Sequence, residues 1–114
     1  MATRPGLRVL DAAQMVVDEV NRLLKNRPLA NADQLRAAAE SITASIQEGF
    51  GRERGPDRNR FLRFARGAAE ETNERLRARY AAKDISSNVY WRLHHRLVAI
   101  VRMLTNLMAA GISS

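Results

Sequence analysis

Cysteine is absent from this chain of 114 residues, and proline, glycine and aromatic residues are scarce. Without cysteine, the chain forms no disulfides and offers no thiolate for catalysis. Three prolines and six glycines leave few helix breaks, and 5% aromatic residues leave few strand formers, so the composition favours helices. No apolar run approaches the roughly 20 residues that cross a membrane, and the first residues lack the apolar segment of a signal peptide. We therefore expect a cytoplasmic protein with no membrane partner.

The charge of the chain is unevenly distributed. Apolar residues make up 46% and charged residues 27%, a balance typical of a chain that folds around one core. The first 50 residues carry six of the 19 basic and six of the 12 acidic residues, so the whole net charge of +7 falls on residues 51–114. No acidic residue follows Asp84. A localised basic half favours an anionic partner, with nucleic acid first, although a basic surface also serves solubility alone.

Four segments repeat apolar residues at three- and four-residue spacing, which predicts amphipathic helices. The predicted helices cover about residues 7–26, 31–50, 56–82 and 87–110. Because the connections are short, we expect a single domain over residues 1–114, folded as an all-α, up-down-up-down four-helix bundle. The expected buried face of the third helix consists of Phe61, Ala65, Ala68, Thr72 and Leu76, with Phe64, Ala69 and Tyr80 beside them.

The predicted helix ends rest on capping signals. Asn31 and the glutamine three residues later resemble a capping box at the start of the second helix. Pro56 suits the first turn of the third helix, because its missing N–H would have no partner there. Ser86 or Ser87 is a suitable N-cap for the fourth helix, and Gly111 is expected just past its end.

An arginine-rich segment connects the second and third predicted helices, where residues 48–67 read EGFGRERGPDRNRFLRFARG. Positive charge at a helix N-terminus opposes the helix dipole, so helix stability does not account for these arginines. The guanidinium fork matches phosphate better than the point charge of lysine. With few aromatic residues, we expect contacts to the nucleic-acid backbone rather than to bases. The candidate phosphate contacts are Arg52, Arg54, Arg58, Arg60, Arg63, Arg66 and Arg77.

Two predicted surface features suggest contacts between subunits. Trp91 and Val98 lie seven residues apart on the flank of the fourth helix, off its core stripe, so they are candidate subunit contacts. The alternative is a tryptophan folded over a loop. Ala37, Ser41 and Ala44 form a strip of small residues on the outer side of the second helix, which permits close approach of another helix. The alternative is that alanine is simply a good helix former.

Patterns for catalysis or metal binding are weak. His94 and His95 are adjacent and point about 100° apart on a helix, so they do not clamp a metal as an i, i+4 pair does. Glu70 and Glu74 share a face with the arginines and lack the Glu-x-x-His pattern of a di-iron bundle. The phosphate loop G-x-x-x-x-G-K-[ST] is missing as well. We predict no catalytic residue, no metal and no cofactor, and therefore a protein that is not an enzyme.

The second and third predicted helices carry a recognisable run of residues. The family pattern is roughly Q-L-R-R-A-A-x-S-I-P-A-N-I-A-E-G, followed by arginines and an F-L-x-x-A-x-G-S segment. The matching positions are Gln34, Leu35, Arg36, Ala38, Ser41, Ile42, Ala44, Ile46, Glu48, Gly49, Arg52, Phe61, Leu62, Phe64, Ala65, Gly67 and Glu70. On these residues the chain resembles small bacterial four-helix-bundle proteins first noticed as reading frames inside intervening sequences of large-subunit ribosomal RNA genes. A relative is the accessory variability determinant of diversity-generating retroelements.

The resemblance implies an all-α bundle with a basic surface that assembles as a ring-like homopentamer, with no catalytic activity. The chain departs from the pattern at Thr43, Ser45 and Ala68, where the family has proline, asparagine and serine. Losing the proline predicts a straighter second helix. Two functions remain open: a scaffold that binds nucleic acid, with RNA preferred to DNA, or an adaptor that docks a protein such as a reverse transcriptase.

Overall fold

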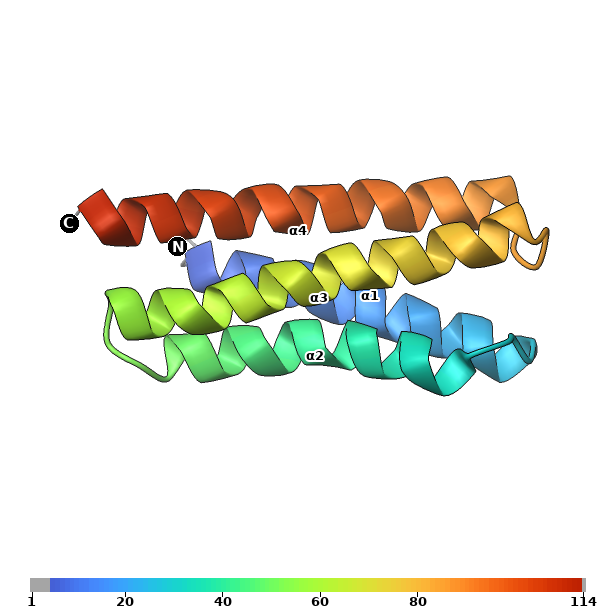
Figure 1. Cartoon of the computed structure of the whole chain (residues 1–114), viewed down its shortest axis with the longest axis horizontal. Coiled ribbons are helices and arrows are strands. Elements are labelled where there is room, and N and C mark those ends of the chain that lie inside the picture. Colours follow the sequence, from blue (N-terminus) through green and yellow to red (C-terminus); the bar gives the residue numbers. More distant parts are fainter. Residues whose placement is uncertain (1–4, 114) are drawn as a thin grey trace.

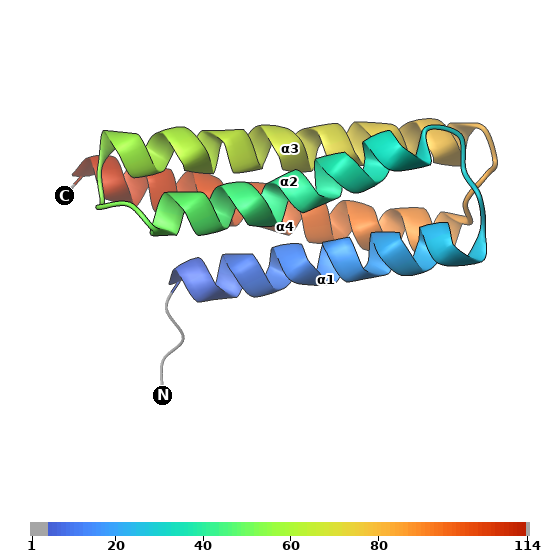
Figure 2. The same ribbon diagram turned by 90° about the horizontal axis from the view of Figure 1, so that it is seen from below.

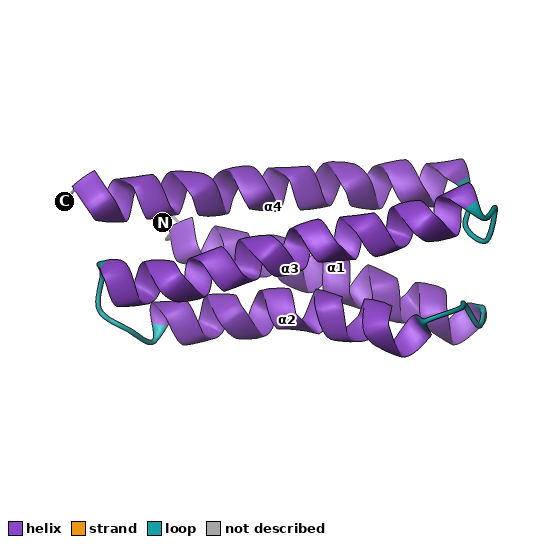
Figure 3. Ribbon diagram, viewed as in Figure 1, coloured by secondary structure: helices purple, strands orange, loops and turns teal. Residues whose placement is uncertain are grey.

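The computed structural model describes residues 5–113 and consists of four helices (Figures 1 and 3). They are α1 (Pro5–Asn26), α2 (Ala32–Phe50), α3 (Pro56–Ala81) and α4 (Ser87–Ser113). Successive helices run in opposite directions along one long axis, and the described residues contain no strand. The predicted all-α, up-down-up-down four-helix bundle is therefore confirmed.

Each helix packs against two neighbours around a shared core. α2 contacts α1 and α3, and α4 contacts α3 and α1, whereas no Cα atoms of the diagonal pairs lie within 8 Å of each other in the described residues. Figures 1 and 2 show the α2–α3 connection, the start of α1 and the end of α4 at one end of the bundle. The arginine-rich segment therefore lies at that end.

The core is a continuous set of aliphatic side chains that the three- and four-residue spacing brings to the inner face of each helix. Full burial of one such side chain contributes about 1.5–3 kcal/mol, so this core accounts for most of the attraction between the helices. Its largest fully buried members are Val9, Val16, Val20, Leu35, Ile42, Ile46, Leu62, Leu76, Leu93, Leu97, Ile100 and Leu104.

The buried face of α3 is rotated relative to the prediction. Phe61, predicted on the buried face, is only partly buried, and Phe64, predicted beside that face, is 54% exposed, so both placements were wrong. Leu62 takes their place because residues spaced alternately by three and four keep one stripe facing the partner helices. That buried stripe consists of Leu62, Ala65, Ala69, Thr72 and Leu76.

Two of the predicted helix ends are confirmed. Pro56 occupies the first turn of α3. The Ser86 hydroxyl accepts a hydrogen bond from the Val89 backbone N–H at 3.2 Å, which makes Ser86 the N-cap of α4. α2 also runs unbroken through Thr43, where the family pattern has proline.

The predicted start of α2 at Asn31 is confirmed, whereas the capping box expected there and the predicted end of α4 are wrong. Asn31 adopts a left-handed conformation (φ 60°) and makes no side-chain cap. The amide oxygen of Gln34 instead accepts a hydrogen bond from Arg75 of α3 at 2.8 Å, so a contact between helices replaces the capping box. Gly111 does not end α4, which continues to Ser113. A β-carbon at Gly111 would lie 3.2 Å from Asn59 Oδ1, so close packing against α3 explains this glycine.

Candidate nucleic-acid interface

The segment between α2 and α3 is a tight connection of five residues, Gly51 to Gly55. Gly55 has φ 135°, a backbone conformation that residues with a β-carbon rarely adopt. Gly49, in the last turn of α2, is buried, and a β-carbon there would lie 3.2 Å from Leu62 Cδ2. The glycines therefore bring the end of α2 close to the start of α3 and hold the arginines in a compact cluster.

Arg52 and Arg60 are neutralised by acidic residues of the same segment. Arg52 binds Glu48 Oε1 at 2.9 Å and Asp57 Oδ2 at 3.0 Å, and Arg60 binds Asp57 Oδ1 at 3.2 Å. Both guanidinium groups lie over the Phe61 ring, 4.5 and 4.8 Å from its centre. The hydrogen bond from Arg52, followed by the interactions with Arg60, lowers the pKa of Asp57. Phe61 thus packs with arginines at the junction rather than in the core.

Arg58 holds the connection in shape. Its Nη2 and Nε atoms donate to the Arg52 backbone carbonyl at 2.6 and 3.1 Å. Its guanidinium lies 4.8 Å from the centre of the Phe50 ring. Arg58 therefore links α3 to the connection and to the end of α2, although no carboxylate within residues 5–113 pairs with its charge.

The other predicted contacts differ in how they are paired. Arg54 and Arg63 have no hydrogen-bond or ion-pair partner in the described part of the chain, and Arg66 donates only to the Thr105 hydroxyl, at 3.2 Å. Arg77 lies 3.5 Å from Glu74. The Tyr90 hydroxyl first, and then Glu74, raise the pKa of Arg77. All seven predicted arginines remain predictions as nucleic-acid contacts.

Sequence reasoning missed Arg102 of α4. This residue is exposed and lies three positions before Thr105, so the two share one side of the helix. It has no acidic partner within residues 5–113, and α4 itself contains no acidic residue. The absence of acidic residues after Asp84 was the available signal. We use the name unpaired arginine surface for the set Arg54, Arg63, Arg66 and Arg102, which have no acidic partner within residues 5–113 and come from the connection, α3 and α4.

Residues 6–106 match the family of 23S rRNA-intervening sequence proteins. The chain belongs to this family. The match takes in α2, α3 and the connection between them, together with most of α1 and α4. Among curated proteins, none matches the chain.

Two large apolar residues of α4 are exposed, Trp91 and Val98. Trp91 is 45% exposed and Val98 is 38% exposed. The Trp91 ring packs edge-on against Tyr90 and Tyr80, with ring centres 5.0 and 6.4 Å apart. Trp91 thus contacts the aromatic residues where α3 and α4 meet and still leaves nearly half of its surface uncovered.

The small-residue strip of α2 borders a groove on the outside of the bundle. Ala37, Ser41 and Ala44 are all exposed, and the first two line this groove between α2 and α3. On the α3 side the groove is lined by Gly67, Arg63 and the exposed Phe64 ring, which the sequence prediction had placed beside the buried face. A small-residue floor beside an exposed ring offers a surface for another chain.

The histidines and acidic residues do not form a metal site in the described part of this family member. No group of three His, Asp or Glu side chains within residues 5–113 is arranged to hold a metal ion. His94 Nδ1 instead forms a hydrogen bond with the Asn73 side-chain amide of α3, at 3.1–3.2 Å. A search of the helices between residues 5 and 113 finds no apolar stretch that could span a membrane.

Proposed function

We propose that this protein is a non-enzymatic basic scaffold that binds RNA through contacts to phosphate groups. The observation that carries the proposal is the unpaired arginine surface. Its four guanidinium groups meet no carboxylate within the described residues, so they remain available to an external anion. The family description refers to 23S rRNA, which favours RNA over DNA or an acidic protein.

The arginines divide into two roles under this proposal. Arg52 and Arg60 hold the connection together with Glu48 and Asp57, and for them phosphate would have to replace an existing carboxylate partner. Arginines without a carboxylate partner gain a new interaction on binding, so they contribute more affinity. Because phosphate contacts carry no sequence information, we expect binding that depends on salt and little on sequence.

We also infer that the protein is a homo-oligomer, with the pentamer suggested by the family resemblance as the expected form. The exposed Trp91 and Val98 on α4 and the groove bordered by Ala37 and Ser41 offer two different apolar surfaces. Two distinct surfaces on one protomer suit a head-to-tail contact, which closes into a ring when the rotation permits. Repeating the unpaired arginine surface around such a ring would increase avidity for a long RNA.

Two charge-matched variants test RNA binding. One replaces the unpaired arginines by glutamine (R54Q, R63Q, R66Q and R102Q together). The other replaces four arginines that pair with carboxylates at Asp33, Asp57, Glu71 and Glu74 (R36Q, R60Q, R75Q and R77Q). Affinity for a structured RNA is measured by fluorescence anisotropy between 50 and 200 mM salt. We expect the first variant to lose affinity and to reduce the salt slope by about one for each lost contact, and the second to lose much less.

Three outcomes would contradict the proposal. Equal loss in both variants would mean that only net charge matters. Absence of binding by the unchanged protein at 50 mM salt would exclude a phosphate-binding surface. Capture of a specific protein that survives nuclease treatment, without RNA binding, would favour the adaptor function.

A further inference from the structure

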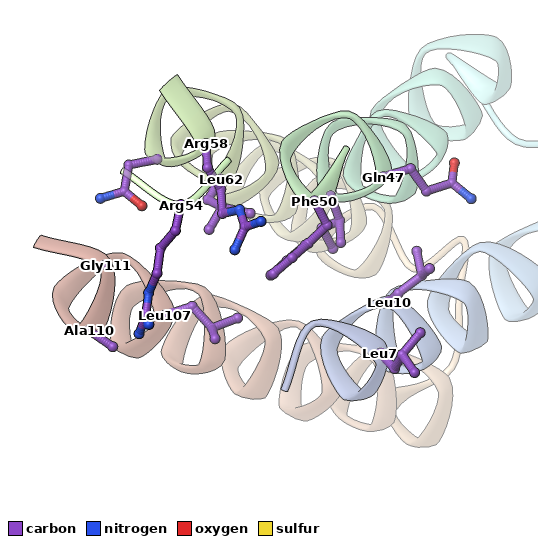
Figure 4. Close-up of a pocket in the computed structure, with 12 residues that line it drawn as sticks. Leu7, Leu10, Gln47, Phe50, Arg54, Arg58, Leu62, Leu107, Ala110 and Gly111 are labelled. Atoms are coloured by element: carbon purple, nitrogen blue, oxygen red, sulfur yellow. The ribbon is translucent and has the colours of Figure 1, made fainter. Parts of the chain in front are cut away.

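A cavity of about 420 Å³ opens at the end of the bundle that carries the α2–α3 connection (Figure 4). Within the unpaired arginine surface, only Arg54 lines this cavity, and the apolar part of its wall has no role in the proposed function. All four helices and the connection contribute to its wall. The lining residues that matter here are Leu7, Leu10, Phe50, Arg54, Leu62 and Leu107.

Apolar side chains around this cavity are less covered than those in the rest of the core. Leu62, at the inner end of the cavity wall, is fully buried. Leu10, Phe50 and Leu107 are only partly buried, and Leu7 is 49% exposed. Covering apolar surface contributes about 25 cal/mol per Å². A ligand with an apolar body would therefore be stabilised here, and the volume falls within the roughly 300–1,000 Å³ of small-molecule sites.

The polar groups of the wall define the other part of the ligand. Arg58 is held by the Arg52 carbonyl and the Phe50 ring. Asn59 donates its side-chain amide to the Met108 carbonyl at 3.1 Å. Arg54 has no such partner among the described residues, and Figure 4 shows its side chain extending from the connection towards α4 along one edge of the cavity. The wall contains no acidic residue and two arginines without a carboxylate partner within residues 5–113, of which Arg54 is also free of other hydrogen bonds there, so a ligand with negative charge complements it.

We propose that this cavity binds a small amphipathic anion of the alkyl carboxylate class. The hydrocarbon chain of the ligand lies among the leucines, and the Arg54 guanidinium binds its carboxylate through a bidentate pair of hydrogen bonds. An inserted nucleobase fits less well, because bases are held by stacking on a free aromatic face. The aromatic ring of this wall, Phe50, already has the Arg58 guanidinium over it. The proposal does not depend on RNA binding.

Decanoate is the probe that tests this site. Binding to the full chain is measured by calorimetry, and the site is located from backbone amide shifts in two-dimensional NMR, both without RNA. We expect saturable binding, with the largest shifts at Leu7, Leu10 and Leu107. Arg54→Gln should lower the affinity for decanoate by roughly 10- to 100-fold. Arg63→Gln, which makes the same charge change away from the cavity, should leave the affinity unchanged. Decanol, which lacks the anion, should bind equally to all three proteins.

A second pair of variants tests the location of the site. Ala110 is exposed and lines the cavity, so Ala110→Trp should fill it and abolish decanoate binding. Ala99→Trp, at an exposed position of α4 outside the cavity, is the control and should bind normally. The proposal is overturned by absence of saturable binding below the micellar range, by equal weakening in the Arg54 and Arg63 variants, or by displacement of decanoate by an equal concentration of a nucleoside monophosphate.

Discussion

The side-chain amide of Asn59 in α3 donates a hydrogen bond to the backbone carbonyl of Met108 in α4, at 3.1 Å. Asn59 is 2% exposed, and it is one of two buried polar side chains among the described residues, the other being Thr72. The contact joins the first turn of α3 to the last turns of α4, beside the α2–α3 connection. Gly111 lies on the same side of α4, and its missing β-carbon leaves room for the Asn59 amide.

A double-mutant cycle tests this contact. Asn59→Ala should destabilise the protein by about 1–3 kcal/mol, because the buried Met108 carbonyl loses its side-chain donor. In the Asn59→Ala background, Gly111→Ala should stabilise by up to about 1 kcal/mol, the helix preference for alanine. In the unchanged protein Gly111→Ala should not raise the free energy of unfolding, because the new β-carbon would crowd Asn59 Oδ1. Urea unfolding measures all four proteins, and an identical effect of Gly111→Ala in both backgrounds would contradict the close packing.

Two helical glycines should respond oppositely to alanine. A β-carbon at Gly49 would lie 3.2 Å from both Leu62 Cδ2 and Phe61 Cβ, whereas nothing lies within 4 Å of one at Gly67. Overpacking costs about 1–3 kcal/mol, which outweighs the gain in helix preference, so Gly49→Ala should destabilise. Gly67→Ala should stabilise α3 by about 0.5–1 kcal/mol. Thermal and urea unfolding compare the two variants, and effects of the same sign would be the wrong result for this geometry.

Asp57 should link stability to pH in the acid range. Its folded pKa is lowered from the ordinary value of 3.8, mainly by the hydrogen bond from Arg52. A carboxylate with a lowered pKa stabilises the fold at pH values above its unfolded pKa, and this contribution is lost as the pH falls through the folded pKa. Asp57→Asn should therefore lower the Tm at pH 7, and the difference should shrink as the pH falls below 3.8. An NMR titration midpoint for Asp57 at or above 3.8 would refute the prediction.

An ion pair between α1 and α4 should contribute measurably to stability. Glu19, whose side chain is 13% exposed, accepts a hydrogen bond from Arg92 Nε at 2.6 Å, and Arg96 Nε lies 4.0 Å from its other oxygen. Glu19→Gln should destabilise by about 1–2 kcal/mol, between the values for exposed pairs and for well-buried charged hydrogen bonds. Glu40→Gln, at an exposed residue without an ion pair in the described structure, is the control. Equal effects would show that the pair contributes nothing.

Assembly should depend on the exposed side chains of Trp91 and Val98. Light scattering at micromolar concentration should give several times the monomer mass of 12.8 kDa. Trp91→Glu and Val98→Glu should each lower this mass, because a charge in an apolar contact is costly. Met15→Glu is the control, since Met15 is also a large exposed apolar residue, 49% exposed, but lies on α1. A monomer at these concentrations would exclude the proposed subunit contact.

Much of the fold was predictable because helix periodicity is local. The apolar spacing predicted a helix over about residues 87–110, and α4 buries Leu93, Leu97, Ile100 and Leu104 at that spacing. The buried face of α3 was harder to predict from the sequence, because Phe61 is apolar enough for the core but packs against the guanidinium groups of Arg52 and Arg60. Periodicity in one helix does not reveal which charged groups a neighbouring turn will supply.

The position of the arginine cluster followed from the sequence alone, because Gly55 and Pro56 mark a helix boundary regardless of distant residues. Which arginines keep an unpaired charge was decided only by the tertiary structure. Arg52 and Arg54 stand two residues apart, yet one binds two carboxylates and the other meets none among the described residues. Arg102 of α4, more than 30 positions along the chain from Arg66, also meets no carboxylate among the described residues. Ion pairing depends on distances between side chains from separate turns and helices, and those distances exist only once the core has packed.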